Sequence, residues 1–319
     1  MQPTFSPEHS ELETNPTKLQ QYVDALEAAF GQAARVVGIL EIGSFAKGEA
    51  VPTSDIDTRI YVTSPAAYLV NLSVTNDHGP PLYDDFVRLH PPLPRQEYTW
   101  WDFNETVMAS VSTALPANIE FGFVDQRYAA YELTRLVDHP SFEHSILLQS
   151  NVLYDPTGFL QTARSQLQGR IFEPLVQHYT TQFLDNLSPR LYACLSPDSF
   201  DVFKLAKSGQ IQWVQQAVRA LRNAVAAKSY LATGHFLYKK SDVLAFYERY
   251  LPAEAPLVQE LYQWKTDATV RAAMVEEFSH SPERLYARFR EALPQVETIV
   301  KKVKGLTQVL FSANDGNQR

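Results

Sequence analysis

Two aspartates, Asp55 and Asp57, stand one residue apart where a polar loop runs into an apolar stretch of the sequence. If that stretch is a strand, residues two apart point to the same side, so the two carboxylates share one face. Two negative charges held that close repel each other, and divalent cations such as Mg²⁺ are a common reason for placing them together. The pair therefore predicts a magnesium site. Two such ions can align an attacking oxygen with a leaving pyrophosphate.

A Gly-Ser pair, Gly43 and Ser44, follows the apolar run of residues 35–42, twelve residues before the aspartates. A backbone N–H and a hydroxyl at the start of a helix form a natural cradle for a phosphate. Lys47, three residues after Ser44, is a candidate phosphate contact. The alternative is that it only lies at the end of a helix and contacts no ligand. The stretch GSFAKG is not a Walker loop, because its lysine precedes the second glycine and no GK[ST] follows.

A third carboxylate on a neighbouring strand would complete the metal cage or act as a general base. Residues 118–125, NIEFGFVD, alternate apolar and other residues with a period of two, which predicts a half-buried strand. Glu120 lies on the polar face of this strand and is the candidate, with a solvent-facing glutamate as the alternative. Asp125 is the next choice, although it falls at or beyond the predicted end of the strand.

The stretch VVGILEIGSFAKGEAVPTSDIDTRIYV, residues 36–62, resembles the nucleotidyltransferase superfamily, the fold shared by DNA polymerase β and the aminoglycoside nucleotidyltransferases. The family pattern is an apolar run, Gly-Ser or Gly-Gly, about ten variable residues, and then Asp-x-Asp opening a strand. The inner form GSxA[RK]G with SDID is the version seen in small-molecule nucleotidyltransferases, which makes these the nearest in pattern.

The resemblance implies roles for five residues of this chain. Gly43 and Ser44 would hold a triphosphate, while Asp55 and Asp57 would bind Mg²⁺, as two ions. Glu120 matches the later carboxylate of the family by placement alone, since no fixed spacing marks it.

The helical second half resembles the family more loosely, in ALRNAVAAKSYLATGHFLYKKSDVL. A lysine after the ATG-like turn often reaches the phosphates in such enzymes, so Lys239 and Lys240 are candidates, with exposed loop lysines as the alternative. Arg222, in the middle of a predicted helix, is expected to make a structural ion pair. Arg59 shares a face with the two aspartates and is expected to pair with one of them.

The activity that the resemblance implies is Mg²⁺-dependent transfer of a nucleoside monophosphate, from ATP or another NTP, to a hydroxyl of a small molecule, with release of pyrophosphate. Residues 1–155 carry a net charge of −13 and the remainder +5. The acidic half suits a cationic acceptor such as an aminoglycoside and repels a nucleic-acid backbone, which argues against a repair polymerase.

Two further alternatives remain open. A protein-modifying nucleotidyltransferase of the toxin–antitoxin type is usually small, whereas this chain continues for about half its length in helices. A nucleotide-binding scaffold without catalysis would need no third carboxylate.

The pattern as a whole predicts an α+β fold, in which a mixed-sheet nucleotidyltransferase domain is followed by an all-α helical-bundle domain. We expect a mobile N-terminal arm over residues 1–16, a catalytic domain over 17–156 and a helical domain over 157–319. Residues 75–102 hold five prolines among aromatic residues and predict a lid or binding insertion.

Periodicity and capping signals place the individual elements. A helix is expected from Thr17 to Gly31, and strands at 35–43, 55–62, 118–125 and within 145–158. Helices are expected in the run that ends at Gly234, after a capping Ser241, and from Ser281-Pro282 onward.

The composition limits the class of protein and the compartment that we expect for this chain. Hydrophobic residues make up 45% and charged residues 20%, as in ordinary globular proteins, and the one cysteine, Cys194, cannot form a disulfide within the chain. No signal peptide and no run of about 18 apolar residues is visible, so we expect a cytoplasmic protein without a membrane span. We expect a monomer or a homodimer.

Overall fold

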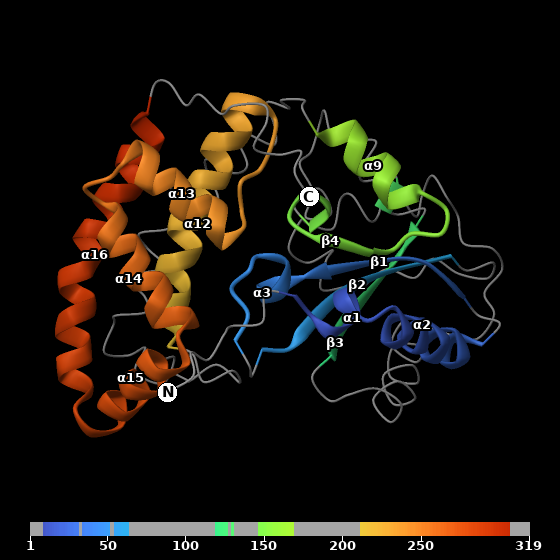
Figure 1. The fold of residues 1–319 in the computed structure, drawn as a ribbon, viewed down its shortest axis with the longest axis horizontal. Coiled ribbons are helices and arrows are strands. Elements are labelled where there is room, and N and C mark those ends of the chain that lie inside the picture. Colours follow the sequence, from blue (N-terminus) through green and yellow to red (C-terminus); the bar gives the residue numbers. More distant parts are fainter. Residues whose placement is uncertain are drawn as a thin grey trace, which may run out of the picture. The chain divides into compact units, whose positions relative to one another are not determined.

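The computed structural model of the chain describes residues 9–31, 34–51, 54–63, 119–126, 129–130, 146–168 and 211–306. These residues form an α+β fold with a four-stranded mixed sheet and several helices (Figure 1). The chain divides into two compact units. The sheet unit takes the described residues from 9 to 47 and from 54 to 168, and the helical unit takes 48–51 and 211–306.

The sheet has the strand order β3-β2-β1-β4. Strand β1 pairs antiparallel with β2 and with β4, whereas β2 pairs parallel with β3, so the sheet is mixed. The strands are β1 (Arg35–Ile42), β2 (Ile56–Thr63), β3 (Ile119–Asp125) and β4 (Asn151–Tyr154).

Helices α2 (Pro16–Phe30) and α9 (Phe159–Leu167) pack against opposite faces of this sheet. On one face the Tyr22 hydroxyl shares a hydrogen bond of 2.7 Å with the Thr58 hydroxyl. On the other face Leu160 comes so near to β1 that a methyl group at Gly38 would lie 2.7 Å from its Cδ1. Because helices cover both faces, β1 and β2 are buried over most of their length rather than on alternate residues.

The helical unit consists, in its described residues, of five helices and the segment 48–51. Trp213 stacks on Phe289 at a ring-centroid distance of 4.4 Å, and the Tyr247 hydroxyl donates to the Leu221 carbonyl at 3.0 Å. These contacts join the first helix of the unit to the later ones around one apolar core. The helices are α12 (Gln212–Thr233), α13 (Lys240–Tyr250), α14 (Ala255–Thr266), α15 (Ala268–His280) and α16 (Pro282–Gly305) (Figure 1).

Segment 48–51 has the contacts of the helical unit, although Lys47 before it and Ser54 after it belong to the sheet unit. Glu49 is 1% exposed, and Ala50 and Val51 are fully buried. A buried segment of this kind needs partners for its polar groups, and Glu49 supplies the one charged side chain that must be matched.

Most elements predicted from the sequence are confirmed to within a residue or two, including all four strands and the end of α12 at Gly234, whose φ is +72°. The capping role of Ser241 was wrong. A cap at Ser241 would start the helix at Asp242, whereas α13 begins two residues earlier, at Lys240, with Lys239 in the N-cap position. Ser281 and Pro282 open α16 as expected.

The described part of the predicted N-terminal arm contains a short helix. Residues Glu11–Thr14 form the short helix α1, because the Ser10 hydroxyl accepts a hydrogen bond of 3.1 Å from the Glu13 N–H and Leu12 is buried. Helix α9 packs on β1, and the sheet unit accordingly continues to residue 168. The predicted insertion at 75–102 lies outside the described residues.

Within the described ranges, no helix offers a stretch long and apolar enough to cross a membrane.

Candidate functional site

The Gly-Ser pair lies where β1 ends and the four-residue helix α3 (Gly43–Ala46) begins. Gly43 has a φ of +72°, a left-handed conformation that other residues adopt only with strain. Ile42, the last residue of β1, is the register partner of Asp57 on β2. The turn at Gly43 is therefore held directly beside the second aspartate of the motif.

The approach of Gly43 to Asp57 is closer than any side chain at that position would allow. A methyl group at Gly43 would lie 2.7 Å from Asp57 Cγ and 2.9 Å from its Cβ, and nearer still to its carboxylate oxygen. Glycine is thus required here twice, for its backbone conformation and for the space that the carboxylate occupies. The two halves of the sequence motif meet at this contact.

Strand β2 positions the two aspartates. Asp55 immediately precedes the strand and Asp57 is its second residue, and both side chains are half-buried. Ile56 between them is buried, as expected for alternation across a strand. Arg59, two residues further along, is also buried.

Glu120 is the second residue of β3, the strand that pairs with β2. Its Cα is the register partner of Asp57 in the parallel pairing of β2 with β3. The side chain of Glu120 lies outside the described part of the structure, so its role as a metal ligand or base stays a prediction.

The donor chemistry of the site suits a hard divalent cation. Carboxylate oxygens are the ligands that Mg²⁺ prefers, and Asp55 and Asp57 supply them where β2 begins, with Asp57 beside the turn at Gly43. The space that a Cβ would fill at Gly43 is taken up by the Asp57 carboxylate itself. Among the side chains that the structure describes, no three His, Cys, Asp or Glu residues gather as a metal-binding group, and the Glu120 side chain is not among those described.

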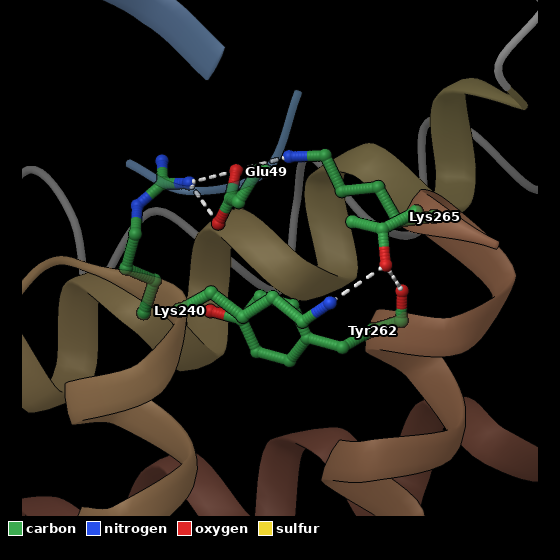
Figure 2. Close-up of polar contacts among 6 residues, drawn as sticks. Glu49, Lys240, Tyr262 and Lys265 are labelled. Atoms are coloured by element: carbon green, nitrogen blue, oxygen red, sulfur yellow. Dashed lines mark hydrogen bonds and ion pairs between the residues drawn. The ribbon is translucent and has the colours of Figure 1, made fainter. Parts of the chain in front are cut away.

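The three candidate lysines fall in different places. Lys47 is the C-cap of α3 in the sheet unit and is half-buried. Lys239 is the N-cap of α13 in the helical unit. The Lys240 amine donates to the Thr266 hydroxyl at 2.9 Å, and burial lowers the pKa of Lys240, with Glu49 acting in the opposite direction (Figure 2).

The helical unit contains a buried ion cluster, Glu49–Arg222–Lys265, that sequence reasoning missed. Arg222 Nη1 lies 2.7 Å from each of the two carboxylate oxygens of Glu49, and the Lys265 amine donates to the same carboxylate (Figure 2). The expectation that Arg222 makes a structural ion pair is confirmed. Its partner is 173 residues away in the sequence, so no local pattern identifies it.

The protonation states within this cluster follow from burial and charge. Burial by itself lowers the pKa of Arg222, but the charge and hydrogen bond of Glu49, together with Tyr262, outweigh burial, so that this pKa is raised. Burial lowers the pKa of Lys265 in spite of Glu49. Burial also raises the pKa of Tyr262, which lies beside the cluster, and the negative charge of Glu49 adds to this effect.

A second buried carboxyl group, Glu41, lies on β1, and the sequence did not predict its burial. Its Oε2 accepts a hydrogen bond of 2.9 Å from the Asn151 amide on β4. Glu41 is the register partner of Thr58, whereas the neighbouring Ile42 is the partner of Asp57, so Glu41 lies on the opposite face of the sheet from the aspartate.

Comparison with known proteins adds no relative for this chain. The sequence matches no protein-family model, and no curated protein is similar to it at a significant level. The function of this chain is therefore inferred from the Gly-Ser and Asp-x-Asp motif and from the approach of Gly43 to Asp57.

Proposed function

We propose that this protein is a Mg²⁺-dependent nucleotidyltransferase that moves a nucleoside monophosphate, from ATP or another NTP, to a hydroxyl group of a small molecule. The observation that carries the proposal is the packing of the Gly43 turn against the Asp57 carboxylate. It brings a candidate triphosphate contact and a candidate metal ligand together, with Glu120 as the adjacent register position on β3.

In the proposed reaction the acceptor oxygen attacks the α-phosphorus of the NTP, the bond from that phosphorus to the bridging oxygen breaks, and pyrophosphate leaves. Gly43 and Ser44 bind the β- and γ-phosphates through a backbone N–H and a hydroxyl. Asp55 and Asp57 hold Mg²⁺, which when bound neutralises charge on the phosphates. Glu120 accepts the proton of the acceptor hydroxyl or joins the metal ligands.

The charge of the chain bears on the acceptor. The net charge of −13 over residues 1–155 favours a cationic small molecule, such as an aminoglycoside, over a polyanion. Incubation of the protein with labelled ATP, Mg²⁺ and a panel of aminoglycosides, nucleosides and proteins would identify the acceptor class. A label on a protein instead would favour the protein-modifying alternative.

The first prediction concerns Asp57→Asn, which removes a negative charge while keeping the shape of the side chain. We expect pyrophosphate release to fall by at least about 100-fold, because loss of a metal ligand costs at least as much as loss of its supporting groups. Asp24→Asn, at an exposed position of α2, is the matched control and should keep the parent rate. An Asp57→Asn protein that transfers nucleotide at the parent rate would refute the proposal.

The second prediction compares two glycines with nearly the same backbone conformation. Gly43 (φ +72°) faces Asp57, whereas a methyl group at Gly158 (φ +69°) would have nothing within 4 Å. Alanine at either position costs about 1–2 kcal/mol of unfolding free energy for the left-handed backbone. Only Gly43→Ala also displaces the carboxylate, so we expect it alone to lose activity, by about 100-fold in a pyrophosphate-release assay. Equal activity of the two variants would show that the close approach has no part in turnover.

A further inference from the structure

The short helix α1 covers a buried carboxyl group of the sheet. Glu41 on β1 is 0% exposed, and its register partner Thr58 is bonded by Tyr22 of α2, so Glu41 lies on the face of the sheet that α2 covers. Helix α1 packs against α2. Ser10, the N-cap of α1, is 1% exposed, and its hydroxyl donates a hydrogen bond to the Glu41 carboxyl group. The first residue of this small helix is therefore in contact with Glu41.

Few groups attach α1 to the sheet unit. A helix of four residues has little stability of its own, because isolated helices shorter than about 12 residues are marginal in water. Two of its side chains are buried, Ser10 and Leu12, and the Ser10 hydroxyl also accepts the Glu13 N–H at 3.1 Å. The contact of His9 with Glu13, at 2.9 Å, is exposed and adds little. Ser10 thus couples the formation of α1 to its contact with Glu41.

The groups that face Glu41 from the strands and from α2 are neutral. Its Oε2 accepts a hydrogen bond of 2.9 Å from the Asn151 amide, and its Oε1 is buried with no hydrogen-bond partner among the residues that the structure describes. Asn151 on β4 and Thr58 on β2 are its register partners. Tyr22 of α2, which bonds Thr58, stays neutral because burial raises its pKa. These three groups supply no positive charge to an ionised Glu41.

The charge of Glu41 is linked to the position of α1. Burial raises the pKa of Glu41 above 4.5, and the hydrogen bonds from Ser10 and Asn151 offset this only in part. The two charges that act on it come from the segment of α1, where Glu13 raises this pKa and His9 lowers it. If α1 left the sheet, water would reach the carboxyl group and its pKa would return toward 4.5. The docked form therefore binds this proton more tightly than the open form, so a rise in pH favours the open form.

We propose that residues 9–14 form a pH-sensitive strap, which covers Glu41 while its carboxyl group is protonated and docks more weakly when Glu41 ionises. The contribution of Glu41 to docking is fully present below pH 4.5 and is lost as the pH rises through the raised pKa. The opening is local, because α2 has buried side chains of its own, among them Tyr22 and Leu26, that hold it to the sheet unit. The proposal is independent of nucleotidyl transfer.

The test is amide hydrogen exchange of the full chain between pH 4.5 and pH 8, expressed as protection factors so that the intrinsic effect of pH on exchange is removed. The reporting amides are Glu13, Thr14 and Asn15, whose N–H groups donate to oxygens at the start of α1. We expect their protection to fall as the pH rises, by up to about tenfold per pH unit while Glu41 ionises, the limit for one proton. Protection of the α2 amides should stay constant.

Three variants identify the group that responds. Glu41→Gln cannot ionise, so we expect its α1 amides to be equally protected at every pH. His9→Gln removes the histidine beside α1, a residue type that changes charge in the same pH range, and we expect it to keep the decrease seen in the parent. Leu12→Ala removes buried apolar surface of α1, and we expect it to lower protection of these amides at pH 4.5 by about tenfold or more.

Each contrary result overturns the proposal in a defined way. Constant protection in the parent, or the same decrease in Glu41→Gln, would show that Glu41 does not control α1. A decrease that disappears in His9→Gln would assign the response to the contact of His9 with Glu13 instead. An equal decrease in α2 would mean that the sheet unit opens as a whole, and unchanged protection in Leu12→Ala would mean that these amides do not report docking.

Discussion

Two glutamates eight residues apart are buried to nearly the same extent and have opposite surroundings. Glu41, on β1 of the sheet unit, is 0% exposed and accepts a hydrogen bond from the neutral Asn151 amide. Glu49, in the helical unit, is 1% exposed and is bonded by Arg222 and Lys265. Burial is the same in the two cases, so any difference in their behaviour comes from the partners.

The partners decide the charge of each carboxyl group. An arginine cannot lose its proton in a protein, so Glu49 keeps a permanent counter-charge within hydrogen-bond distance. For Glu41, burial raises the pKa, and the hydrogen bonds from Ser10 and Asn151 offset this only in part. The nearby Glu13 raises it further, whereas His9 lowers it.

Two equally buried glutamates can therefore have different roles. Glu49 forms ion pairs that hold helices of its unit together, whereas Glu41 can respond to pH. A carboxylate beside a permanent arginine cation is favoured in its charged form, because neutralising it would leave that cation buried without compensation. A carboxyl group among neutral donors keeps its proton to a higher pH, because the neutral form avoids the cost of a buried charge.

The largest effect in this comparison is expected from Arg222→Met, which removes the permanent counter-charge of Glu49. Breaking a buried pair from one side costs about 3–5 kcal/mol of unfolding free energy, because the other charge stays buried. Urea denaturation at pH 7 measures this loss. The variant would make the environment of Glu49 more like that of Glu41.

Arg290→Met is the matched control, because Arg290 is an exposed arginine on α16 of the same unit. Exposed substitutions of this kind change stability by about 0.5 kcal/mol or less. If both variants unfold at the same urea concentration, the Glu49 cluster contributes nothing that an exposed arginine does not, and the contrast with Glu41 would lose its basis.

The sequence predicted the strands and the turn that carry the candidate residues of the sheet unit, because the signals there are local. The positive φ at Gly43 agrees with the glycine that opens the motif, and the spacing of Asp55 and Asp57 gives their shared face directly. The register of Glu120 beside Asp57 also agrees with the alternation of residues 118–125. These properties depend on neighbours within a strand or a turn.

The Glu49 cluster could not be predicted in this way, because its members come from distant parts of the chain. Glu49 and Lys265 are separated by 216 residues, and nothing in GSFAKGEAV distinguishes a buried glutamate from one on a surface loop. The burial of Glu41 could not be predicted either, because a glutamate in an apolar strand can equally well point to solvent at the edge of a sheet. The start of α13 at Lys240 rather than after Ser241 shows the same limit for a helix end, where tertiary contacts compete with a local cap.

The smaller effect is expected from Glu41→Gln, measured as a function of pH. Because the pKa of Glu41 is raised in the folded protein, the folded state binds more protons than the unfolded state above the ordinary value of 4.5. The contribution of Glu41 to the stability of the parent should therefore be fully present below pH 4.5 and should fall as the pH rises through the folded-state pKa. Glutamine cannot ionise, so the unfolding free energy of the variant should lack this decline and should gain on the parent as the pH rises.

Denaturant unfolding of the parent and of Glu41→Gln at several values between pH 4.5 and pH 8 tests this, with Glu260→Gln as the control. Glu260 is an exposed glutamate on α14, and we expect its variant to differ from the parent by about 0.5 kcal/mol or less, as exposed substitutions usually do. A constant difference between parent and Glu41→Gln over the whole range would mean that Glu41 stays charged in the folded protein. In that case neutral donors would suffice to keep a buried carboxylate ionised, and the two cations at Glu49 would not be what distinguishes the two regions.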